Sequence, residues 1–250
     1  MIGTFLGLLL VVLPVTETSS LEKGDKEFVL IRYTQAEAFY DSALTASIDS
    51  AEVLWRLARV YVCVADVSPR DQKLDLYRRA EAFAHRCIRA DSTESEGHTW
   101  RAAAFGNIAM FEGGRTKVAL CYAIKGELMS AINLNPNDDI AYSILGSFYM
   151  ALGNVSWVER QLAAIFLGSL PDGGYKESEI ALKKAITLAP MTIRHHFELG
   201  RLYMLQDRRD EAFMEFRKVA SLPLKLASDQ RTQSRAARLA NELSGESSGD

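Results

Sequence analysis

The sequence has little cysteine, proline or glycine, and each shortage excludes a class of protein. Three cysteines in 250 residues cannot form the disulfide framework of a small secreted domain. Six prolines and 16 glycines are too few for a fibrous or low-complexity chain. The chain has 29 Lys and Arg against 32 Asp and Glu, so it lacks the excess of basic charge that indicates a nucleic-acid partner. With 48% hydrophobic residues the chain has an ordinary globular composition, which selects no function.

The motifs of common enzymes and metal sites are also missing. There is no His-Glu-x-x-His, no glycine-rich phosphate loop ending in Lys-Ser/Thr and no Gly-x-Ser-x-Gly. His195 and His196 are adjacent, and on a helix they point about 100° apart, which makes a poor joint metal site. Cys63, Cys87 and Cys121 lie in apolar helical stretches without metal or redox spacing. We expect buried free thiols, no catalytic residue, no cofactor and no metal.

The chain opens with an apolar run, residues 5–15 (FLGLLLVVLPV), followed by the polar residues 16–20. This order is typical of a signal peptide, although residues 1–4 carry no Lys or Arg. A bilayer-spanning helix needs about 20 apolar residues, so the run is short for one. Residues 1–20 are therefore a signal peptide, a short membrane anchor or a buried helix. A signal predicts export to the periplasm or the membrane, and its absence predicts a cytoplasmic protein.

From residue 21 onward apolar residues recur at helical spacing, without convincing alternating runs. Four segments fit the 34-residue tetratricopeptide (TPR) pattern, in which large and small residues alternate at fixed positions of two helices. These segments are residues 51–91, 95–136, 139–190 and 193–223. The third is lengthened by an insertion at 154–174. In the fourth, Leu199-Gly200, Tyr203, Ala212 and Phe216 occupy the pattern positions.

A helix pair of this kind cannot bury its apolar face alone, so the pairs must stack. Small residues let the two helices approach, large ones fill the space between them, and Pro136 and Pro190 end helices. The sequence predicts an all-α, right-handed α-solenoid of about four TPR-like helix pairs over residues 21–243. It also predicts an inserted helix and a C-terminal capping helix within 224–243. Residues 244–250 are predicted to form a disordered polar tail.

The insertion resembles that of a known family. Residues 155–160 (VSWVER), 163–171 (AAIFLGSLP) and 175–182 (YKESEIAL) are similar to three successive motifs of the regulator of microtubule dynamics family. In that family an LSWxER stretch leads through an apolar helix to an FG-PP turn and a tY-EAL helix. This chain has Leu170-Pro171 where the family often has two prolines.

The resemblance extends over roughly residues 35–243, and it includes residues 52–59 (EVLWRLAR), 98–100 (HTW) and 222–225 (LPLK). It implies a TPR-like fold and a protein partner. It also allows a lipid-like ligand, because some relatives are associated with membrane contact and lipid binding.

Three residues of the insertion need a structural role. Glu159 and Arg160 are neighbours and cannot face each other on a helix. We interpret each as capping or pairing with a different neighbouring helix, while Trp157 anchors the insertion against the solenoid. The alternative is that they line a ligand site.

Solenoids of this kind usually bind partners on the concave side, formed by the first helix of each pair. Helical spacing places these candidates on that face: Trp55, Arg59, Thr99, Asn107, Ser143, Ser147, Met150, Phe197, Arg201 and Met204. An apolar groove with Arg59 and Arg201 near its edge would suit an amphipathic helix or an anionic amphiphile. Alternatively, Trp55, Phe197 and Met204 pack against a neighbouring helix and leave no groove.

The sequence is consistent with two functions, and the missing motifs disfavour a third, an enzyme. The first is a non-enzymatic scaffold or adaptor that binds a protein segment in the concave groove. The Lys/Asn pattern of a TPR carboxylate clamp is absent, which disfavours binding of chaperone tails. The second is a carrier or sensor of a lipid-like amphiphile, in which residues 161–167 line or cover the groove. The N-terminal run would place either protein near a membrane.

Overall fold

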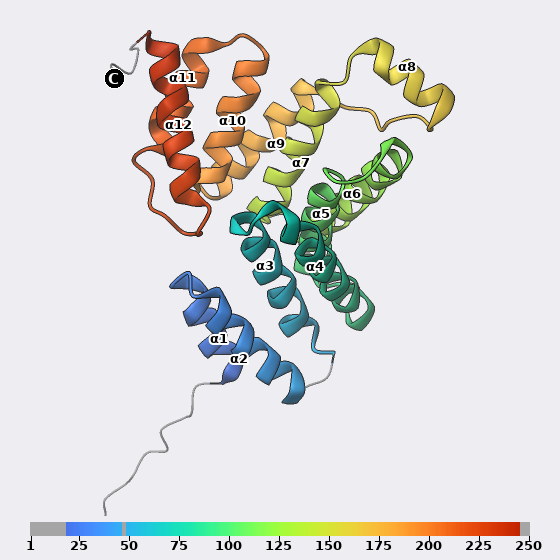
Figure 1. Ribbon diagram of the computed structural model, residues 1–250, viewed down its shortest axis with the longest axis vertical. Coiled ribbons are helices and arrows are strands. Elements are labelled where there is room, and N and C mark those ends of the chain that lie inside the picture. The colour runs from blue at the N-terminus through green and yellow to red at the C-terminus, as the bar shows by residue number, and fades with distance from the viewer. Residues whose placement is uncertain (1–18, 47–48, 246–250) are drawn as a thin grey trace, which may run out of the picture.

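The computed structural model describes residues 19–46 and 49–245, and over these residues all regular structure is helical (Figure 1). The described helices are α1 Ser20–Val29, α2 Tyr33–Ala46, α3 Ala51–Val67, α4 Arg70–Ala90, α5 Ser95–Ile108, α6 Gly114–Leu134, α7 Asp139–Gly153, α8 Trp157–Phe166, α9 Tyr175–Leu188, α10 Ile193–Leu205, α11 Arg209–Val219 and α12 Asp229–Ser244. None of these helices is both long enough and apolar enough to cross a membrane.

The helices form the α-solenoid that the sequence predicts. The four predicted pairs are α3/α4, α5/α6, α7/α9 and α10/α11, with α8 as the inserted helix and α12 as the cap. Helix α12 begins at Asp229 rather than at the predicted 224, because the Asp229 carboxylate accepts hydrogen bonds from the amides of Lys225 and Leu226 and fixes them as a turn. A further hairpin, α1/α2, precedes the predicted pairs and was not identified by the repeat pattern.

The predicted terminal segments lie mostly outside the described residues. Of the predicted signal or anchor at 1–20, only Ser19 and Ser20 are described, where the Ser19 side chain caps α1. Of the predicted tail at 244–250, only Ser244 and Gly245 are described.

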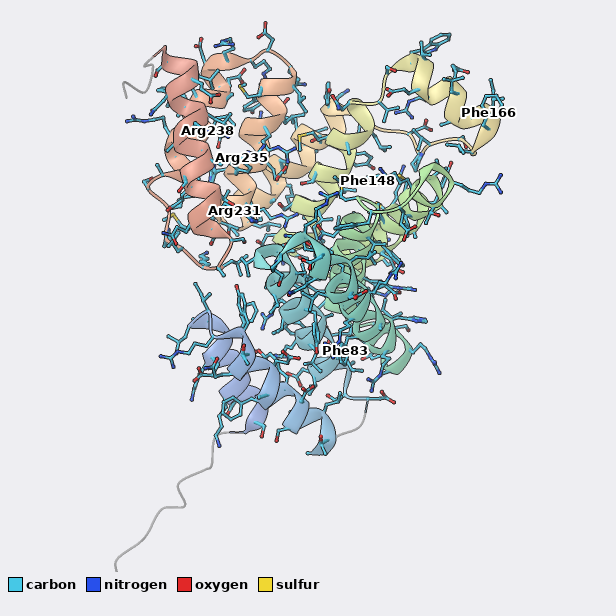
Figure 2. All side chains as sticks on the ribbon, viewed as in Figure 1. Phe83, Phe148, Phe166, Arg231, Arg235 and Arg238 are labelled. Atoms are coloured by element: carbon cyan, nitrogen blue, oxygen red, sulfur yellow. The ribbon has the colours of Figure 1, made fainter. Side chains whose placement is uncertain are left out.

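The two ends of the solenoid are in direct contact. The amide of Ala227, in the loop before α12, donates a hydrogen bond to the Tyr33 hydroxyl of α2 at 3.0 Å. The Arg231 guanidinium of α12 donates to the backbone carbonyl of Asp66 in α3 at 2.9 Å (Figure 2). Leu226 and Ala227 also pack against the apolar cluster of the N-terminal hairpin. The last helix and the loop before it therefore bridge back to the first repeats.

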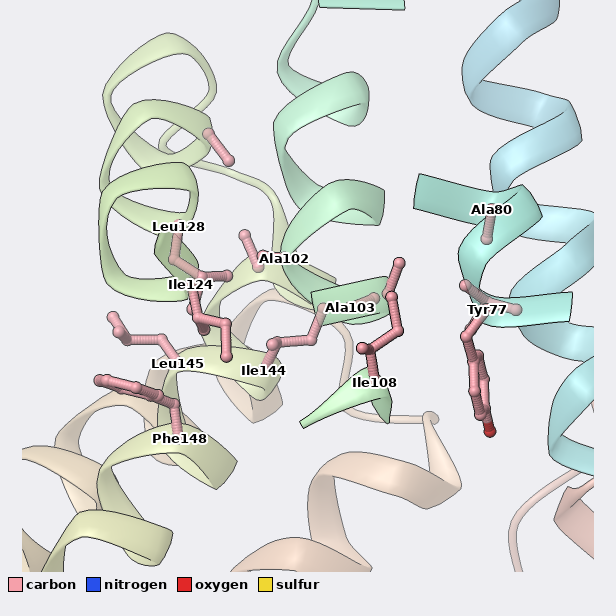
Figure 3. Packing of buried hydrophobic residues seen from close by; sticks show 14 of the residues in the cluster. Tyr77, Ala80, Ala102, Ala103, Ile108, Ile124, Leu128, Ile144, Leu145 and Phe148 are labelled. Atoms are coloured by element: carbon pink, nitrogen blue, oxygen red, sulfur yellow. The ribbon is translucent and has the colours of Figure 1, made fainter. Parts of the chain in front are cut away.

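The buried apolar residues form three clusters along the stack, one around α1–α3, one in the middle and one around α10–α12. Figure 3 shows the middle cluster, which contains Tyr77 of α4, Ile108 of α5, Ile124 of α6 and Phe148 of α7. Burial raises the pKa of the Cys63 and Cys87 thiols to about 12, so these two are the buried free thiols expected from the sequence. The free thiol of Cys121 is only half-buried.

An ion-pair cluster joins the third and fourth helix pairs. The Glu179 carboxylate of α9 lies 2.6 Å from Nη1 of Arg208 and 2.7 Å from Nζ of Lys183. The hydrogen bond from Arg208, against a smaller effect of burial, lowers the Glu179 pKa from 4.5 to about 2. A lowered pKa in the folded state stabilises the protein above pH 4.5, and this stabilisation is lost as the pH falls toward 2.

We therefore expect Glu179→Gln to lower the free energy of unfolding by about 2 kcal/mol near pH 7, after allowance for the partial exposure of both cations. The deficit should shrink as the pH falls from 4.5 toward 2, as urea unfolding at several pH values can show. Glu52→Gln is the matched control, because Glu52 is 60% exposed and pairs with Arg56 at 3.5 Å. Equal losses in the two variants, or a Glu179→Gln loss independent of pH, would contradict this assignment.

Candidate functional site

At the N-terminal end, the α1/α2 hairpin contacts the predicted groove residue Arg59. The Arg59 guanidinium lies 3.7 Å from the centroid of the Phe28 ring and donates to the Tyr40 hydroxyl at 3.2 Å. It also lies 3.4 Å from Asp25 and 4.9 Å from the Trp55 ring. Arg59 thus holds the hairpin against α3 rather than standing free at the edge of a groove, which corrects the prediction. Arg59 was expected to be free because the repeat pattern had not identified the α1/α2 hairpin.

In the middle of the solenoid the predicted polar residues are tied to the backbone or to a helix cap. Thr99 is buried and donates to the Asp138 carboxylate at 2.5 Å, and Asp138 caps α7 through the Ala141 amide. Asn107 and Ser147 each donate to the carbonyl one turn earlier in their own helices. Burial raises the pKa of Asp138. These side chains therefore organise helices α5 and α7.

Helices α7 and α10 carry the predicted apolar residues toward the C-terminal end. Phe197 and Met150 are buried in one apolar cluster, and Phe197 packs against Phe216 of α11, as in the alternative in which it contacts a neighbouring helix. Met204 is 37% exposed and the Arg201 side chain is 41% exposed, which leaves both accessible. Ser143 is fully buried, and its hydroxyl has no hydrogen-bond partner among the described residues. The predicted list therefore contains accessible residues mainly toward the C-terminal end.

A cationic surface lies at this end, formed by α10 and the capping helix. Arg231, Arg235 and Arg238 follow one another at spacings of four and three residues and share one face of α12 (Figure 2). The Arg235 guanidinium lies 5.5 Å from the Phe197 ring centroid, so this face turns toward the inner side of α10. Together with two residues of α10 they form what we call the arginine face: Arg194, Arg201, Arg231, Arg235 and Arg238.

Carboxylates balance only part of this charge. Glu198 pairs with Arg201 at 2.9 Å, and Glu242 lies 3.9 Å from Arg238. Within the described residues, Arg194, Arg231 and Arg235 form no ion pair, and Nε of Arg194 is buried without a hydrogen-bond partner. The arginine face therefore contains three guanidinium groups without a described carboxylate partner, one of which, Arg231, donates to the Asp66 carbonyl. The α12 arginines are not among the predicted site residues, because the sequence signal of that helix was its apolar side.

The three residues of the insertion serve α8 itself. The Glu159 carboxylate accepts from the amide and the hydroxyl of Ser156, which lowers the Glu159 pKa and completes a capping box. Arg160 donates to the carbonyls of Leu152 and Pro171, so it ties the two ends of the insertion together. Trp157 is 73% exposed and does not anchor the insertion against the solenoid, which corrects the prediction.

The histidines lie apart and are bound to carboxylates of other helices. His195 lies 2.8 Å from Asp139, and His196 lies 2.6 Å from Glu215. In the described part of the chain, no group of three or more His, Cys, Asp or Glu residues could hold a metal ion. His195 and His196 thus link neighbouring helices.

A partly open cleft of about 370 Å³ lies between α11 and α12. It is lined by Phe216, Arg217, Ala220, Ser221, Ala237, Ala240 and Asn241. Ala237 and Ala240 lie on a different side of α12 from Arg231 and Arg235, whereas Asn241 follows Arg238 by three residues. The cleft therefore borders the arginine face at Asn241.

Comparisons with known proteins agree on family and fold. Residues 19–244 match the family model described as Regulator of microtubule dynamics protein 1-3. The chain is 27% identical to Regulator of microtubule dynamics protein 1 of Bos taurus, over 82% of this chain and 69% of that protein. It is 28% identical to Regulator of microtubule dynamics protein 2 of Homo sapiens, over 57% of this chain and 35% of that protein.

Among solved structures, the fold is similar to that of a thermophilic TPR protein from Thermus thermophilus. The TM-score is 0.64 at 22% identity, and the match covers 88% of this chain and 96% of the other. The likeness confirms the TPR-like solenoid.

Proposed function

This chain belongs to the Regulator of microtubule dynamics protein 1-3 family, and from that premise we propose that it is a non-enzymatic scaffold that binds a protein segment on its concave side. TPR-like solenoids bind partners along the inner surface of their stacked helices. The accessible part of that surface is the C-terminal part, because the α1/α2 hairpin contacts Arg59 through Phe28 and Tyr40.

The segment that fits this surface is acidic with apolar residues between its carboxylates. The observation that supports it most is Arg235, which lies over the Phe197 ring and has no carboxylate partner among the described residues. A guanidinium binds a carboxylate through two parallel hydrogen bonds and is easily desolvated beside an aromatic ring. Met204 supplies exposed apolar surface on the same side of α10. Charge and apolar contact are thus available together.

A peptide array that varies acidic and apolar content, probed with the full chain, tests this function. We expect binding to rise with the number of Glu and Asp residues, to require at least one large apolar residue and to weaken with salt. The best peptide, measured by fluorescence anisotropy, should bind Arg235→Glu at least about tenfold more weakly.

Arg209→Glu is the matched control. Arg209 is exposed at the start of α11, and the substitution changes the net charge by the same amount away from the arginine face. Equal weakening by the two substitutions would show a general charge effect and would contradict the proposed site. Binding that ignores peptide charge would contradict the acidic partner.

The lipid carrier is the other function that the same experiments address. A carrier of an amphiphile would copurify with lipid, which organic extraction and mass spectrometry detect. Recovery of one lipid class with the full chain, reduced in Arg235→Glu but not in Arg209→Glu, would support the lipid carrier and contradict the protein partner. In a lipid carrier we would not expect residues 161–167 to cover the ligand, because no residue of α8 is buried against the solenoid.

A further inference from the structure

Helix α8 leaves an unusually large apolar surface uncovered. No residue of α8 is buried, and Trp157, Ile165 and Phe166 are 73%, 70% and 68% exposed. Val158, Leu162 and Leu167 add to the same surface. Single exposed apolar side chains are common, whereas a contiguous group of this size on a folded protein indicates an interaction site.

The apolar residues occupy one side of α8, and no charged residue interrupts them. At 100° per residue, Trp157, Val158, Leu162, Ile165 and Phe166 fall within half of the helix circumference. Glu159 and Arg160, the charged residues of the helix, lie on the other half and are bound to Ser156 and to backbone carbonyls. The exposed half can therefore be transferred into an apolar medium without moving a charge.

Helix α8 projects from the solenoid and is held rigidly in that position. Figure 1 shows it beyond the ends of α7 and α9, at the corner where the α5–α6 turn also lies. The segment that follows α8 is fixed to α6, because the Tyr122 and Ser169 hydroxyls lie 3.0 Å apart and Lys125 donates to the Asp172 carbonyl at 3.2 Å. An apolar helix face that projects from the protein is better placed to insert into a lipid surface than to line the groove of the solenoid.

Cations lie beside this apolar surface. A Cβ at Gly114 would lie 3.0 Å from Cδ1 of Leu167, so the first turn of α6 adjoins the end of α8. Arg115 and Lys117 in that turn are exposed and form no ion pair with a described carboxylate. Met110, in the preceding turn, is 73% exposed. An apolar helix face bordered by cations is the arrangement that binds an anionic membrane surface.

A second copy of the chain fits this surface less well. Full burial removes roughly 60–120 Å² of a large aliphatic side chain and about 150–250 Å² of an aromatic one from water, so the part-exposed set on α8 offers on the order of 500 Å². Two copies paired through α8 would bury about 1,000 Å², below the roughly 1,200–2,000 Å² of stable interfaces. A membrane has no such requirement, because each side chain that enters contributes by itself.

We propose that α8 and the first turn of α6 form a membrane-docking element that inserts the α8 apolar face into the interface of an anionic bilayer. The helix lies in the plane of the membrane, since ten residues span only about 15 Å and cannot cross it. Trp157 enters the headgroup region with Ile165 and Phe166, and Arg115 and Lys117 contact the anionic headgroups.

Vesicles with dibrominated acyl chains, containing phosphatidylcholine with or without phosphatidylserine, test the proposal on the full chain. Bromine quenches only a tryptophan that enters the bilayer, so the readout reports Trp157 separately from binding through residues 1–20. We expect quenching that increases with phosphatidylserine and that disappears in Trp157→Phe, which keeps Trp55 and Trp100. Inorganic phosphate should not compete, because the apolar face contributes most of the binding.

Ile165→Glu should reduce Trp157 quenching at least about tenfold at a given lipid concentration, since it places a charge in the centre of the inserted face. Ile180→Glu is the matched control, because Ile180 of α9 is 62% exposed but outside α8. Unquenched Trp157, or equal losses in the two variants, would overturn the proposal. A dimer in light scattering that Ile165→Glu converts to monomer would overturn it in favour of a second copy.

Discussion

Replacing Phe216 by alanine is expected to lower the free energy of unfolding by about 3–5 kcal/mol. Phe216 is fully buried in α11, where its ring occupies the space that Gly200 of α10 leaves free. A Cβ at Gly200 would lie only 2.6 Å from Cε1 of Phe216, so the two helices meet at this ring. The Phe197 ring lies 5.8 Å away, centroid to centroid, and would lose its neighbour. The substitution leaves a cavity that rigid helices close only in part.

Urea unfolding followed by circular dichroism measures this loss. Phe166→Ala is the matched control, because Phe166 is 68% exposed on α8 and should change the stability by less than about 0.5 kcal/mol. A Phe216→Ala protein as stable as the Phe166→Ala protein would show that the α10/α11 contact does not depend on this ring.

Replacing Gly146 by valine is expected to lower the free energy of unfolding by about 3 kcal/mol, through overpacking. A Cβ at this position of α7 would overlap Cγ of Leu182 and would lie 3.3 Å from the Leu182 backbone nitrogen. The Ser178 hydroxyl of α9 also donates to the Gly146 carbonyl at 2.7 Å, so the two helices cannot separate without losing a buried hydrogen bond. A branched side chain must therefore push α7 and α9 apart.

The same substitution at Gly126 provides the comparison. Gly126 is exposed within α6, and nothing lies within 4 Å of a Cβ built there. Valine has a higher helix propensity than glycine, so Gly126→Val should stabilise the protein by about 0.3 kcal/mol. Thermal or urea unfolding of both variants should therefore give changes of opposite sign. Losses of equal size would mean that glycine is not required for the approach of α7 and α9.

The repeated helix pairs were predictable because their signal is local and recurs. Gly146 and Gly200 stand at the same position of two copies, and each receives a large side chain from the second helix of its own pair. The α1/α2 hairpin carries part of the same signature, since Gly24 receives the Tyr40 ring at the sequence separation that joins Gly200 and Phe216, but its remaining positions did not identify it as a repeat. Without that hairpin, the contacts of Arg59 with Phe28 and Tyr40 could not be foreseen.

The candidate site was less predictable because it depends on contacts between distant parts of the chain. The spacing of Arg231, Arg235 and Arg238 is visible in the sequence, but the direction of that face is set by contacts of α12 with α3 and α10. Trp157 shows the opposite limitation. An apolar residue in an insertion is ordinarily assigned to the core, whereas no neighbouring helix of the described structure covers α8.

The bridge from the loop before α12 back to α2 and α3 has a consequence for unfolding. In an open array each repeat contacts only its neighbours, so the terminal repeats fray independently. Here the hydrogen bond between Ala227 and Tyr33 joins residues at opposite ends of the chain, as does that between Arg231 and Asp66. Amide exchange should therefore report the first and last repeats opening together, as a single cooperative unit, before the central repeats.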